Sequence, residues 1–596
     1  MRNAETILSI IRERGKQKLP LEDIYRQLYN RDLYLRAYSR LYRNHGAMTP
    51  GATNETVDGM ALTKIDKIIT VIREERYRWT PVRRTLIPKK SGKLRALGLP
   101  TWSDKLLQEV IRSILDAYYE PQFSQHSHGF RSGRGCHTTL DEITRRWHGV
   151  KWYVEGDISQ CFDSLDHQVM LSILNENLRD NRFLRLLSNL LKAGYLEDWK
   201  YHATLGGVPQ GGVVSPVLSN VYLDRLDQFV ECVLLPTYNY GEHRKPSPPY
   251  MALLNAARNN RIAGNHEEAK KLRQQAQQMP SRDPNDPEFR RLWYVRYADD
   301  WLLGFSGPRD EAEQIKVRMR EFLQDELKLE LSLEKTLITN ARTEAARFLG
   351  YEIINQHADD KHCRKQRSIN GASGLKVPVD VIREKCLKYM RHGKPIQRAE
   401  RLNDTDFSII AQYQAEYRGV VQYYLKAFNV HRLRQLYQVM KLSLAKTLAD
   451  KNRTSAAKVI RKYQTTVPTP HGRLKVLQAI RQCGEKKKPL VARFGGIELR
   501  RQKDAVINDR PPEVYNSLRS EIVQRLLADQ CELCGSEDNC EVHHVRKLAD
   551  LDQPGQKEKP LWAKRMAARR RKTLVVCQKC HEDIHRERSP RRKSTA

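Results

Sequence analysis

Long apolar runs are missing from this 596-residue sequence. No stretch resembles the roughly 20 consecutive apolar residues that a membrane-spanning helix needs. The first residues contain no apolar signal-peptide core, and Glu5 and Glu13 are atypical of a transit peptide, which is poor in acidic residues. We therefore expect a protein that is not secreted, has no membrane partner, and works in a bacterial cytoplasm or an organellar matrix.

Cysteine is also scarce. The chain has 11 cysteines, and four of them form two C-x-x-C pairs close to the C-terminus. A disulfide framework is typical of small secreted domains with a higher density of cysteine. The distribution therefore predicts a metal site in a reducing compartment and argues against structural disulfides.

Acidic residues are outnumbered by basic ones. Lys and Arg total 105 and Asp and Glu total 71, which gives a formal net charge of +34. This excess indicates a polyanionic partner, with nucleic acid as the first candidate, although a basic surface that is only solvated is the alternative. The apolar fraction of 40% allows real cores, and the length suggests about three or four domains.

The periodicity of apolar residues predicts an α+β chain of several domains. Residues 1–80 have a helical, amphipathic pattern, and residues 81–100 alternate apolar and basic residues around K-K-S-G-K, as a basic hairpin does. The other predicted features are a helix near 104–118, a Gly/Arg-rich loop at 128–137, a strand at 152–158, helices at 169–193 and 217–230, a polar insertion at 235–290, a helix at 309–327, a strand pair near 329–339, a strand at 348–353, a boundary at 356–372, helices over 376–480 and a basic linker at 484–515.

Acidic residues that could bind a metal ion occur in two segments of this basic chain. Asp157 ends the strand-like run W-Y-V-E-G-D-I, and Asp299 and Asp300 are adjacent in Y-V-R-Y-A-D-D-W-L-L-G-F, at a predicted hairpin turn. Like charges this close repel, and burial adds a cost on the order of several kcal/mol unless a positive charge offsets it. Nucleotidyl transfer uses two Mg²⁺ ions about 4 Å apart, held by carboxylates from separate strands. The pattern thus favours a magnesium site, whereas a lone A-D-D is also compatible with an ordinary turn.

Seven short segments between residues 89 and 351 occur together in one order. They are K-K-S-G-K-L-R-A-L-G-L-P-T, H-G-F-R-S-G-R-G-C, E-G-D-I-S-Q-C-F-D-S-L-D-H, G-G-V-P-Q-G-G-V-V-S-P-V-L-S-N, Y-A-D-D, L-S-L-E-K-T and R-F-L-G-Y. With these segments the chain resembles a group II intron-encoded reverse transcriptase and maturase. The resemblance implies a right-hand polymerase, with fingers and palm at 1–355, followed by an α-helical thumb or maturase (X) domain at 365–480.

The resemblance assigns metal and sugar contacts in the palm. It implies that Asp157 and Asp299 bind Mg²⁺ and that Asp300 lies beside them in the catalytic turn. Phe162 falls where the family places an aromatic ring against the sugar, which would exclude a 2′-hydroxyl and select deoxynucleotides. An ordinary core phenylalanine is the alternative for Phe162.

The resemblance also assigns contacts to the incoming nucleotide. Gln210 and Gly211 of the P-Q-G motif would line the pocket under the nucleotide. Lys93 and Arg95 of the basic hairpin would contact the triphosphate, with a solvated basic face as the alternative. Lys335 of L-S-L-E-K-T matches a proposed general acid for the pyrophosphate leaving group, with a surface lysine as the alternative.

Tyrosines are interleaved with Arg and Lys over residues 407–442. Arg and Lys bind phosphates and aromatic rings can stack on unpaired bases, although most of these tyrosines fit the core side of a helix better. The segments R-G-V-V-Q-Y-Y at 418–424 and A-K-T-L-A-D-K-N at 445–452 resemble the family's maturase domain, which implies intron RNA as a partner. Residues 484–525, with K-K-K and R-F-G-G-I-E-L-R-R, resemble its DNA-binding segment.

The C-terminal region carries a Cys/His cluster. Two C-x-x-C pairs can close one tetrahedral zinc site through Cys531, Cys534, Cys577 and Cys580. Four thiolates saturate that ion, so the neighbouring histidines are left for another role. A structural zinc finger that binds DNA without cutting it is the alternative.

The histidines lie in V-H-H-V at 542–545 and C-Q-K-C-H-E-D-I-H at 577–585. His581 and His585 are four residues apart and share one face if this run is helical. These segments resemble the HNH, or ββα-metal, endonucleases, which implies a nuclease domain at 526–596. In that family pattern His544 is the general base, and His543, His581 and His585 hold one catalytic divalent cation, for which we expect Mg²⁺. Lys572 or Thr573 stands where the pattern has its name-giving Asn, and this position gets no role.

The sequence thus predicts a multifunctional group II intron-encoded protein. We expect it to assist splicing of its intron RNA, to nick double-stranded target DNA, and to copy the RNA from the nicked 3′ end with dNTPs. There are two alternatives. The first is a splicing cofactor whose polymerase fold only binds RNA. The second is a site-specific DNA endonuclease whose polymerase domain is not used. Intact Asp157, Asp299 and Asp300 argue against the first, since a scaffold does not need three costly carboxylates.

Overall fold

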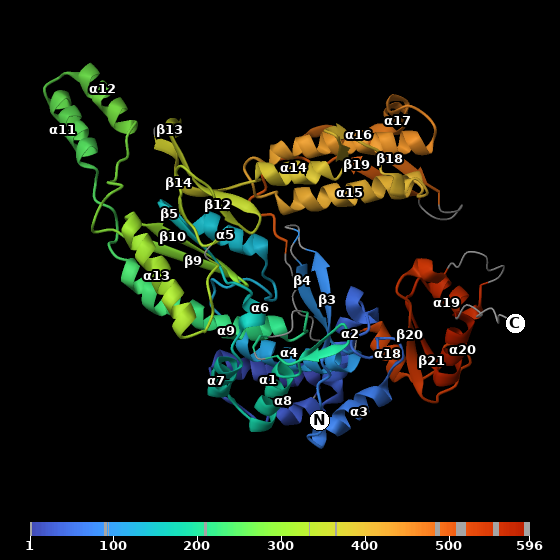
Figure 1. The fold of residues 1–596 in the computed structure, drawn as a ribbon. Coiled ribbons are helices and arrows are strands. Elements are labelled where there is room, and N and C mark those ends of the chain that lie inside the picture. The colour runs from blue at the N-terminus through green and yellow to red at the C-terminus, as the bar shows by residue number, and fades with distance from the viewer. Residues whose placement is uncertain are drawn as a thin grey trace.

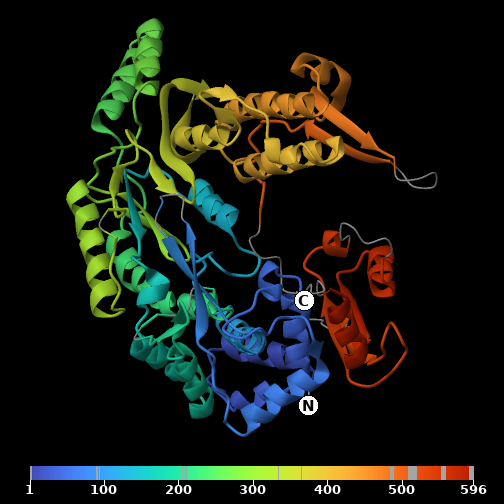
Figure 2. The same cartoon turned by 45° about the vertical axis from the view of Figure 1, so that its right-hand side comes forward.

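The computed structural model describes residues 3–88, 92, 94–204, 206–207, 211–332, 334–363, 366–482, 489–507, 520–551 and 559–588. A helical N-terminal part, a palm sheet, a thumb and a C-terminal domain follow one another along the chain (Figure 1). The C-terminal domain lies beside the N-terminal helices in both views (Figures 1 and 2). No described helix is both long enough and apolar enough to cross a membrane.

The N-terminal part packs around one buried helix. Helix α4 (Trp102–Tyr119) is capped by Thr101, whose side chain accepts a hydrogen bond from the backbone of Asp104, and most of its residues are buried. The other helices are α1 (Ala4–Lys16), α2 (Arg31–Leu41) and α3 (Leu62–Arg73), and β1 (Leu21–Glu22) pairs with β6 (Leu178–Arg179). These helices confirm the amphipathic pattern of the first 80 residues.

The basic hairpin predicted at 81–100 is present. Strands β3 (Val82–Pro88) and β4 (Leu94–Leu99) pair antiparallel, and β7 (Tyr195–Glu197) and β8 (Lys200–His202) extend the sheet in the order β4-β3-β7-β8. The apolar side chains near its tip are exposed, among them Leu86, Ile87 and Leu94. The hairpin therefore projects from the body of the N-terminal part.

The palm is a four-stranded antiparallel sheet in the order β11-β5-β10-β9. Its strands are β5 (Trp152–Asp157), β9 (Arg291–Tyr297), β10 (Asp300–Ser306) and β11 (Ile338–Asn340). Alternate residues of β10 face two separate cores: Trp301 and Leu303 pack with the N-terminal helices, and Leu302 packs with the thumb side. This period of two is the reason that a continuous apolar run suits β10.

The palm part of the chain also contains helices. They are α5 (Cys136–Arg146), α6 (Cys161–Ser164), α7 (His167–Asn177), α8 (Asn181–Leu191), α9 (Ser215–Phe229) and α13 (Arg309–Asp325). The polar insertion at 235–290 holds α10 (Leu235–Tyr238) and a hairpin of α11 (Pro248–Ile262) and α12 (His266–Gln277), which projects away from the body (Figure 1).

Two predictions near the end of the palm are wrong. In the predicted strand pair at 329–339 only β11 is a strand, and Leu331 makes an isolated bridge to Ile158. The predicted boundary at 356–372 lies inside a long hairpin of β13 (Tyr351–Cys363) and β14 (Gln366–Lys376), joined by β12 (Ala346–Phe348). The polar composition predicts a linker, but strand pairing is made by the backbone and is compatible with polar side chains.

The thumb combines helices with a sheet. Its helices are α14 (Val379–Leu387), α15 (Asp406–Tyr423), α16 (Arg434–Lys451) and α17 (Ala456–Tyr463), and a short hairpin joins β15 (Met390–Arg391) to β16 (Lys394–Pro395). Strands β17 (Gln464–Thr469), β18 (Gly472–Arg481) and β19 (Leu490–Gly495) form one antiparallel sheet. The prediction of helix to residue 480 and of a linker at 484–515 is therefore wrong for these strands. Their alternation, as in R-L-K-V-L-Q-A-I, was obscured by charged residues.

The C-terminal domain has two paired strands between helices. Its elements are α18 (Glu521–Leu527), β20 (Cys540–His544), α19 (Leu561–Arg569), β21 (Thr573–Cys577) and α20 (Gln578–Arg588). Strand β2 (Met60–Ala61) of the N-terminal part pairs with β20 and gives the sheet order β2-β20-β21. The C-terminal domain thus shares both a sheet and a hydrophobic core with residues from the start of the chain.

Candidate active sites

Three carboxylates meet at one end of the palm sheet. Asp157 is the last residue of β5 and lies directly opposite Asp300, the first residue of β10. Asp299 lies in the β9–β10 turn, after Ala298 with a φ of 57°. Burial, together with the negative charges of Asp299 and Asp157, raises the pKa of Asp300 to about 7, and burial and Asp157 raise the pKa of Asp299. The cluster is electrostatically costly by itself, and a bound cation would relieve that cost.

Positive side chains approach these carboxylates from two elements. The Lys335 ammonium group donates a hydrogen bond to Asp157, and this bond raises the pKa of Lys335. The charge of Arg95, in β4, opposes the upward shift of the Asp299 pKa. The structure therefore brings two sequence-predicted nucleotide-binding residues to the carboxylate cluster.

A buried ion pair supports the β9–β10 turn that carries Asp299. Arg296 of β9 pairs with Asp227 of α9 at 2.6 Å, and both side chains are fully buried. Arg296 also donates to the carbonyl oxygen of Ala298 at 2.8 Å, and Tyr294 donates to Asp227 at 2.7 Å. Such a pair fixes the turn geometry, since breaking it would leave a buried charge without compensation. Sequence reasoning missed this pair; the charged Arg inside the apolar run Y-V-R-Y was its only signal.

The loop H-G-F-R-S-G-R-G packs against the same turn. A side chain at Gly129 would lie 2.2 Å from the Ala298 backbone nitrogen, so only glycine allows this approach. His128 and His126 both bind Glu142 of α5, at 2.9 Å for His128. Burial opposes ionisation of Glu142, but these hydrogen bonds outweigh it and lower its pKa to about 2.

Phe162 and Gly211 are the other predicted nucleotide-binding residues in the described part of the chain. Phe162 makes an edge-to-face contact with Phe130, with ring centroids 6.0 Å apart. Gly211, with a φ of 105°, lies against β4, because a side chain there would be 2.5 Å from the Gly98 carbonyl oxygen. Lys93 and Gln210 lie outside the described residues.

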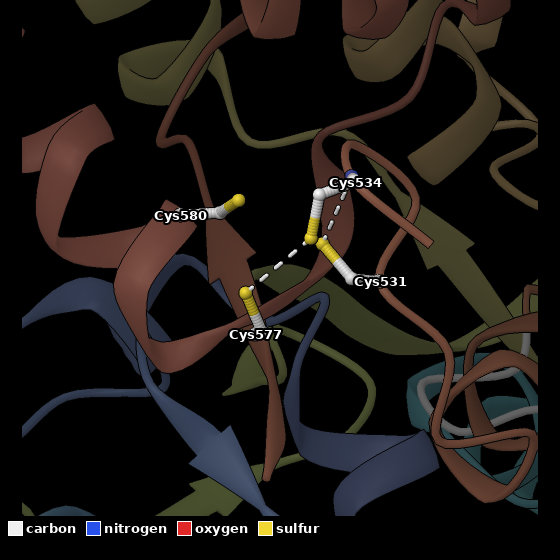
Figure 3. A group of neighbouring side chains, drawn as sticks. All are labelled: Cys531, Cys534, Cys577 and Cys580. Carbon is white, nitrogen blue, oxygen red and sulfur yellow. Dashed lines mark hydrogen bonds between the residues drawn. The ribbon is translucent and has the colours of Figure 1, made fainter. Parts of the chain in front are cut away.

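The four predicted cysteine ligands converge in the C-terminal domain (Figure 3). The sulfur atoms of Cys531, Cys534, Cys577 and Cys580 all lie within 4.8 Å of one another. Cys534 and Cys577 are 3.7 Å apart, sulfur to sulfur, and Cys531 accepts a backbone hydrogen bond from Cys534. Four thiol groups from two knuckles at this spacing can hold one tetrahedral metal ion.

Three predicted histidine ligands form a second cluster, and a fourth group joins them. His581 Nε2 lies 3.0 Å from His543 Nδ1 and 3.1 Å from His585 Nε2. The carboxylate of Asp58, from the N-terminal part, lies among the three imidazoles. Burial favours the neutral acid, but hydrogen bonds from His543 and His581 outweigh it and hold the pKa of Asp58 well below its usual range. Sequence reasoning missed Asp58, which carries no motif.

His544 faces away from this cluster. It alternates with His543 along β20, and its Nε2 atom lies 3.0 Å from the hydroxyl oxygen of Tyr38 in α2. Burial lowers the pKa of His544 to about 3, so the imidazole is neutral near pH 7. Thr573 lies opposite His544 in β21.

A basic groove, which we define by Arg434, Lys441, Arg473, Lys475 and Arg500, runs along the thumb. It has a volume of about 580 Å³ and also includes Tyr417 and Tyr437. Tyr413, Tyr417 and Tyr424 are buried in the thumb core, which confirms that most tyrosines of this region pack internally. The groove thus offers phosphate-binding charge with little aromatic surface.

Three protein families match parts of this chain. "Reverse transcriptase (RNA-dependent DNA polymerase)" matches residues 87–239, "Type II intron maturase" matches 372–492, and "AI2M/AI1M-like, HNH endonuclease" matches 531–581. The chain is 37% identical to "Group II intron-encoded protein LtrA" of Lactococcus lactis subsp. cremoris, over 94% of this chain and 95% of that protein. The chain is a group II intron-encoded protein.

Two fungal relatives of this group II intron-encoded protein are more distant. A "91 kDa protein in cob intron" of Schizosaccharomyces pombe is 32% identical, over 94% of this chain and 69% of that protein. A COX1/OXI3 intron 1 protein of Saccharomyces cerevisiae is 30% identical, over 94% of this chain and 68% of that protein. The protein described here is thus a reverse transcriptase, a maturase and an HNH endonuclease in one chain, as the sequence predicts. Enzymes of both catalytic classes use divalent metal ions.

Proposed function

We propose that Asp157 and Asp299 hold the two Mg²⁺ ions of DNA synthesis, with Asp300 completing the acidic surface. The opposition of Asp157 and Asp300 across two strands, with Asp299 in the adjoining turn, is the observation that carries this proposal. The donor set fits, because Mg²⁺ prefers oxygen ligands and completes its shell with waters and substrate phosphates. When bound, the ions would supply charge stabilisation for the primer hydroxyl and the leaving group.

The surrounding residues would bind and orient the nucleotide. Arg95, and Lys93 beside it in the sequence, would contact the triphosphate. Lys335 would exchange its bond to Asp157 for the pyrophosphate and pass a proton to it. Phe162 would pack against the sugar and exclude a 2′-hydroxyl. Gln210 and Gly211 would form the floor of the pocket, and the close approach of Gly211 to β4 supports this position.

The C-terminal domain would nick the target DNA. His543, His581 and His585 would hold one divalent cation, and His544 would accept a proton from the attacking water. When bound, the cation would polarise the scissile phosphate. We expected Mg²⁺ here, but three imidazoles also suit zinc, nickel or cobalt. Cys531, Cys534, Cys577 and Cys580 would hold a structural Zn²⁺ that fixes β21 and α20.

The thumb and the segment after it would bind nucleic acid. The basic groove would bind phosphates of the intron RNA, and residues 484–525 would contribute to binding of target DNA. We keep the domain limits 1–355, 365–480, 484–525 and 526–596, with one change: β19 belongs to the thumb sheet. The protein would act in a bacterial cytoplasm or an organellar matrix.

These parts would act in sequence on one target. The chain would promote splicing of its intron, remain bound to the RNA, nick the strand opposite the RNA insertion, and use the new 3′ end to copy the RNA. The test is to incubate the RNA–protein complex with a target duplex labelled on the strand to be nicked, dNTPs and Mg²⁺. We expect the nick to shorten the labelled strand first, and DNA synthesis from the new 3′ end to lengthen it afterwards. Extension that begins at an unnicked end would contradict target priming.

The basic groove has its own test. Replacing Arg434, Lys441 and Arg473 with alanine should weaken intron RNA binding and flatten its dependence on salt, because each lost phosphate contact releases about one counterion fewer. Replacing the exposed residues Arg258, Arg261 and Lys271 of the α11–α12 hairpin is the matched control. An equal loss in both variants would assign binding to net charge alone.

A further inference from the structure

Asp58 occupies a defined place in the histidine cluster. Its Oδ1 atom lies 3.2 Å from His581 Nε2 and 3.3 Å from His543 Nδ1, and its Oδ2 atom lies 3.0 Å from His585 Nε2. All four ligand atoms lie within 4.8 Å of one another, although Asp58 and His544 are 486 positions apart in sequence. Three imidazoles and one carboxylate thus surround a single point.

The backbone holds Asp58 in this place. The backbone N–H of His544 donates a hydrogen bond to Asp58 Oδ1 at 2.7 Å, and the Gly59 N–H donates to the carbonyl oxygen of Val542 at 3.0 Å. The φ of Gly59 is 73°, which favours glycine, and strand β2 begins at the next residue and pairs with β20. The carboxylate is therefore fixed by a strand pairing and not by a flexible side chain alone.

We propose that Asp58 is the fourth ligand of the nuclease cation and that it occupies the coordination position a DNA phosphate oxygen must take. This inference rests on the proposed role of His543, His581 and His585. A catalytic site with three protein ligands keeps its fourth position open for water or substrate, whereas four protein ligands close a tetrahedral site. The Asp58 carboxylate has the charge and oxygen donors of a phosphodiester and is an intramolecular competitor for the cation.

The N-terminal part covers the proposed base as well. Tyr38 lies in hydrogen-bonding distance of His544 Nε2, and Tyr42 packs against the same imidazole, with ring centroids 6.2 Å apart. His544 is 3% exposed and cannot reach a water molecule attacking DNA while α2 remains in place. The docked domain is thus closed at both the metal ligand and the base, and DNA cleavage requires β2 and α2 to withdraw.

Cobalt spectroscopy of the full-length chain tests this inference without relying on activity. The four-cysteine site is first filled with one equivalent of Zn²⁺, and Co²⁺ is then titrated with and without inorganic phosphate. Tetrahedral cobalt with nitrogen and oxygen ligands absorbs visible light strongly, whereas six-coordinate cobalt on carboxylates absorbs weakly. We expect a strong band in the wild type that phosphate does not change. In Asp58→Asn the cobalt affinity should fall by about tenfold or more, and phosphate should shift the band.

Two further variants separate the possible failures. His585→Ala should lose the tetrahedral band; if the wild type has no such band, the proposed histidine site itself fails. If the band is present but is the same in Asp58→Asn and the wild type, or if phosphate shifts both equally, the role of Asp58 is overturned. Asn retains the oxygen that accepts the His544 N–H, so the strand pairing should persist, and thermal unfolding of each variant reports on the fold. Asp66→Asn, an exposed residue of α3, should behave as the wild type.

Tyr38→Phe tests whether α2 covers the proposed base, His544. The ring remains in the core and only the hydroxyl group is lost, so the cobalt band should be unchanged. Nicking of a supercoiled plasmid should become faster, because loss of the Tyr38–His544 hydrogen bond weakens the docking of α2 over the proposed base. Nicking that is equal to or slower than that of the wild type would overturn closure at the base.

Discussion

The polymerase and nuclease sites of this protein are built in different ways. The carboxylates proposed for DNA synthesis lie on neighbouring strands of one sheet and in the adjoining turn, remain partly exposed, and have like-charged neighbours. Of the histidines proposed for the nuclease, His543 and His581 are buried and His585 is exposed, and Asp58 lies among them. The proposed polymerase site is open to cations and substrate, whereas the proposed nuclease site already contains the carboxylate of Asp58. On the proposed assignments, one chain combines a polymerase site that is open to metal and substrate with a nuclease site in which its own carboxylate takes a metal position.

Removal of the structural metal should separate the two sites most completely. In Cys577→Ser one of four zinc ligands is lost, and binding of such a metal contributes folding free energy on the order of 10 kcal/mol. We expect the zinc content to fall by one ion per chain and nicking to be abolished, while the protein that remains soluble still extends primers. Cys232→Ser, an exposed cysteine outside the cluster, is the control. Full nicking by Cys577→Ser would contradict a structural metal.

Asp299→Asn should reduce activity at the proposed polymerase site alone. Loss of a metal-binding carboxylate should cost about 4 kcal/mol of transition-state stabilisation, or roughly a thousandfold in primer extension on an RNA template. Asp325→Asn, at the exposed end of α13, should extend primers normally. Primer extension that survives in Asp299→Asn would refute the metal assignment, and nicking that falls with it would show that the sites are not independent.

His544→Ala should reduce activity at the proposed nuclease site alone. Removal of a general base should slow nicking by about a hundredfold or more, while cobalt binding by the neighbouring histidines is retained. Primer extension should not change, and the exposed His392→Ala variant serves as the control. A variant that nicks DNA at the wild-type rate would remove His544 from the mechanism.

Glu142→Gln should have the smallest effect. It tests how strongly the hydrogen bonds of Glu142, behind the proposed polymerase site, stabilise the fold. The low pKa of Glu142, about 2 against 4.5 for a free glutamate, means that its ionised form stabilises the fold above pH 4.5 and that this stability is lost as the pH falls toward 2. The variant should lower the free energy of unfolding by about 2 kcal/mol at pH 7. Urea titrations should show this difference narrowing between pH 4.5 and 3, whereas the exposed Glu313→Gln should show little difference at any pH.

The sequence was sufficient where chemistry and local pattern coincide. The carboxylate turn, the basic hairpin, the four cysteines and the shared face of His581 and His585 all follow from spacing within short segments. It was insufficient where backbone pairing joins distant segments. Strand β19 follows the charged run at 485–488, the β13–β14 hairpin is rich in polar residues, and β2 is only two residues long. Asp58 is an ordinary loop aspartate until the fold brings it to three histidines.

The shared sheet β2-β20-β21 has a consequence for shortened versions of this protein. Tyr38 and Met60 are fully buried, and α2 packs against α18 and β2 against β20. A chain that ended before residue 520 would expose this apolar face and leave β2 unpaired. Such a polymerase fragment should aggregate unless these positions are made polar, so a soluble minimal enzyme requires redesign of its N-terminal surface as well as deletion of its last domain.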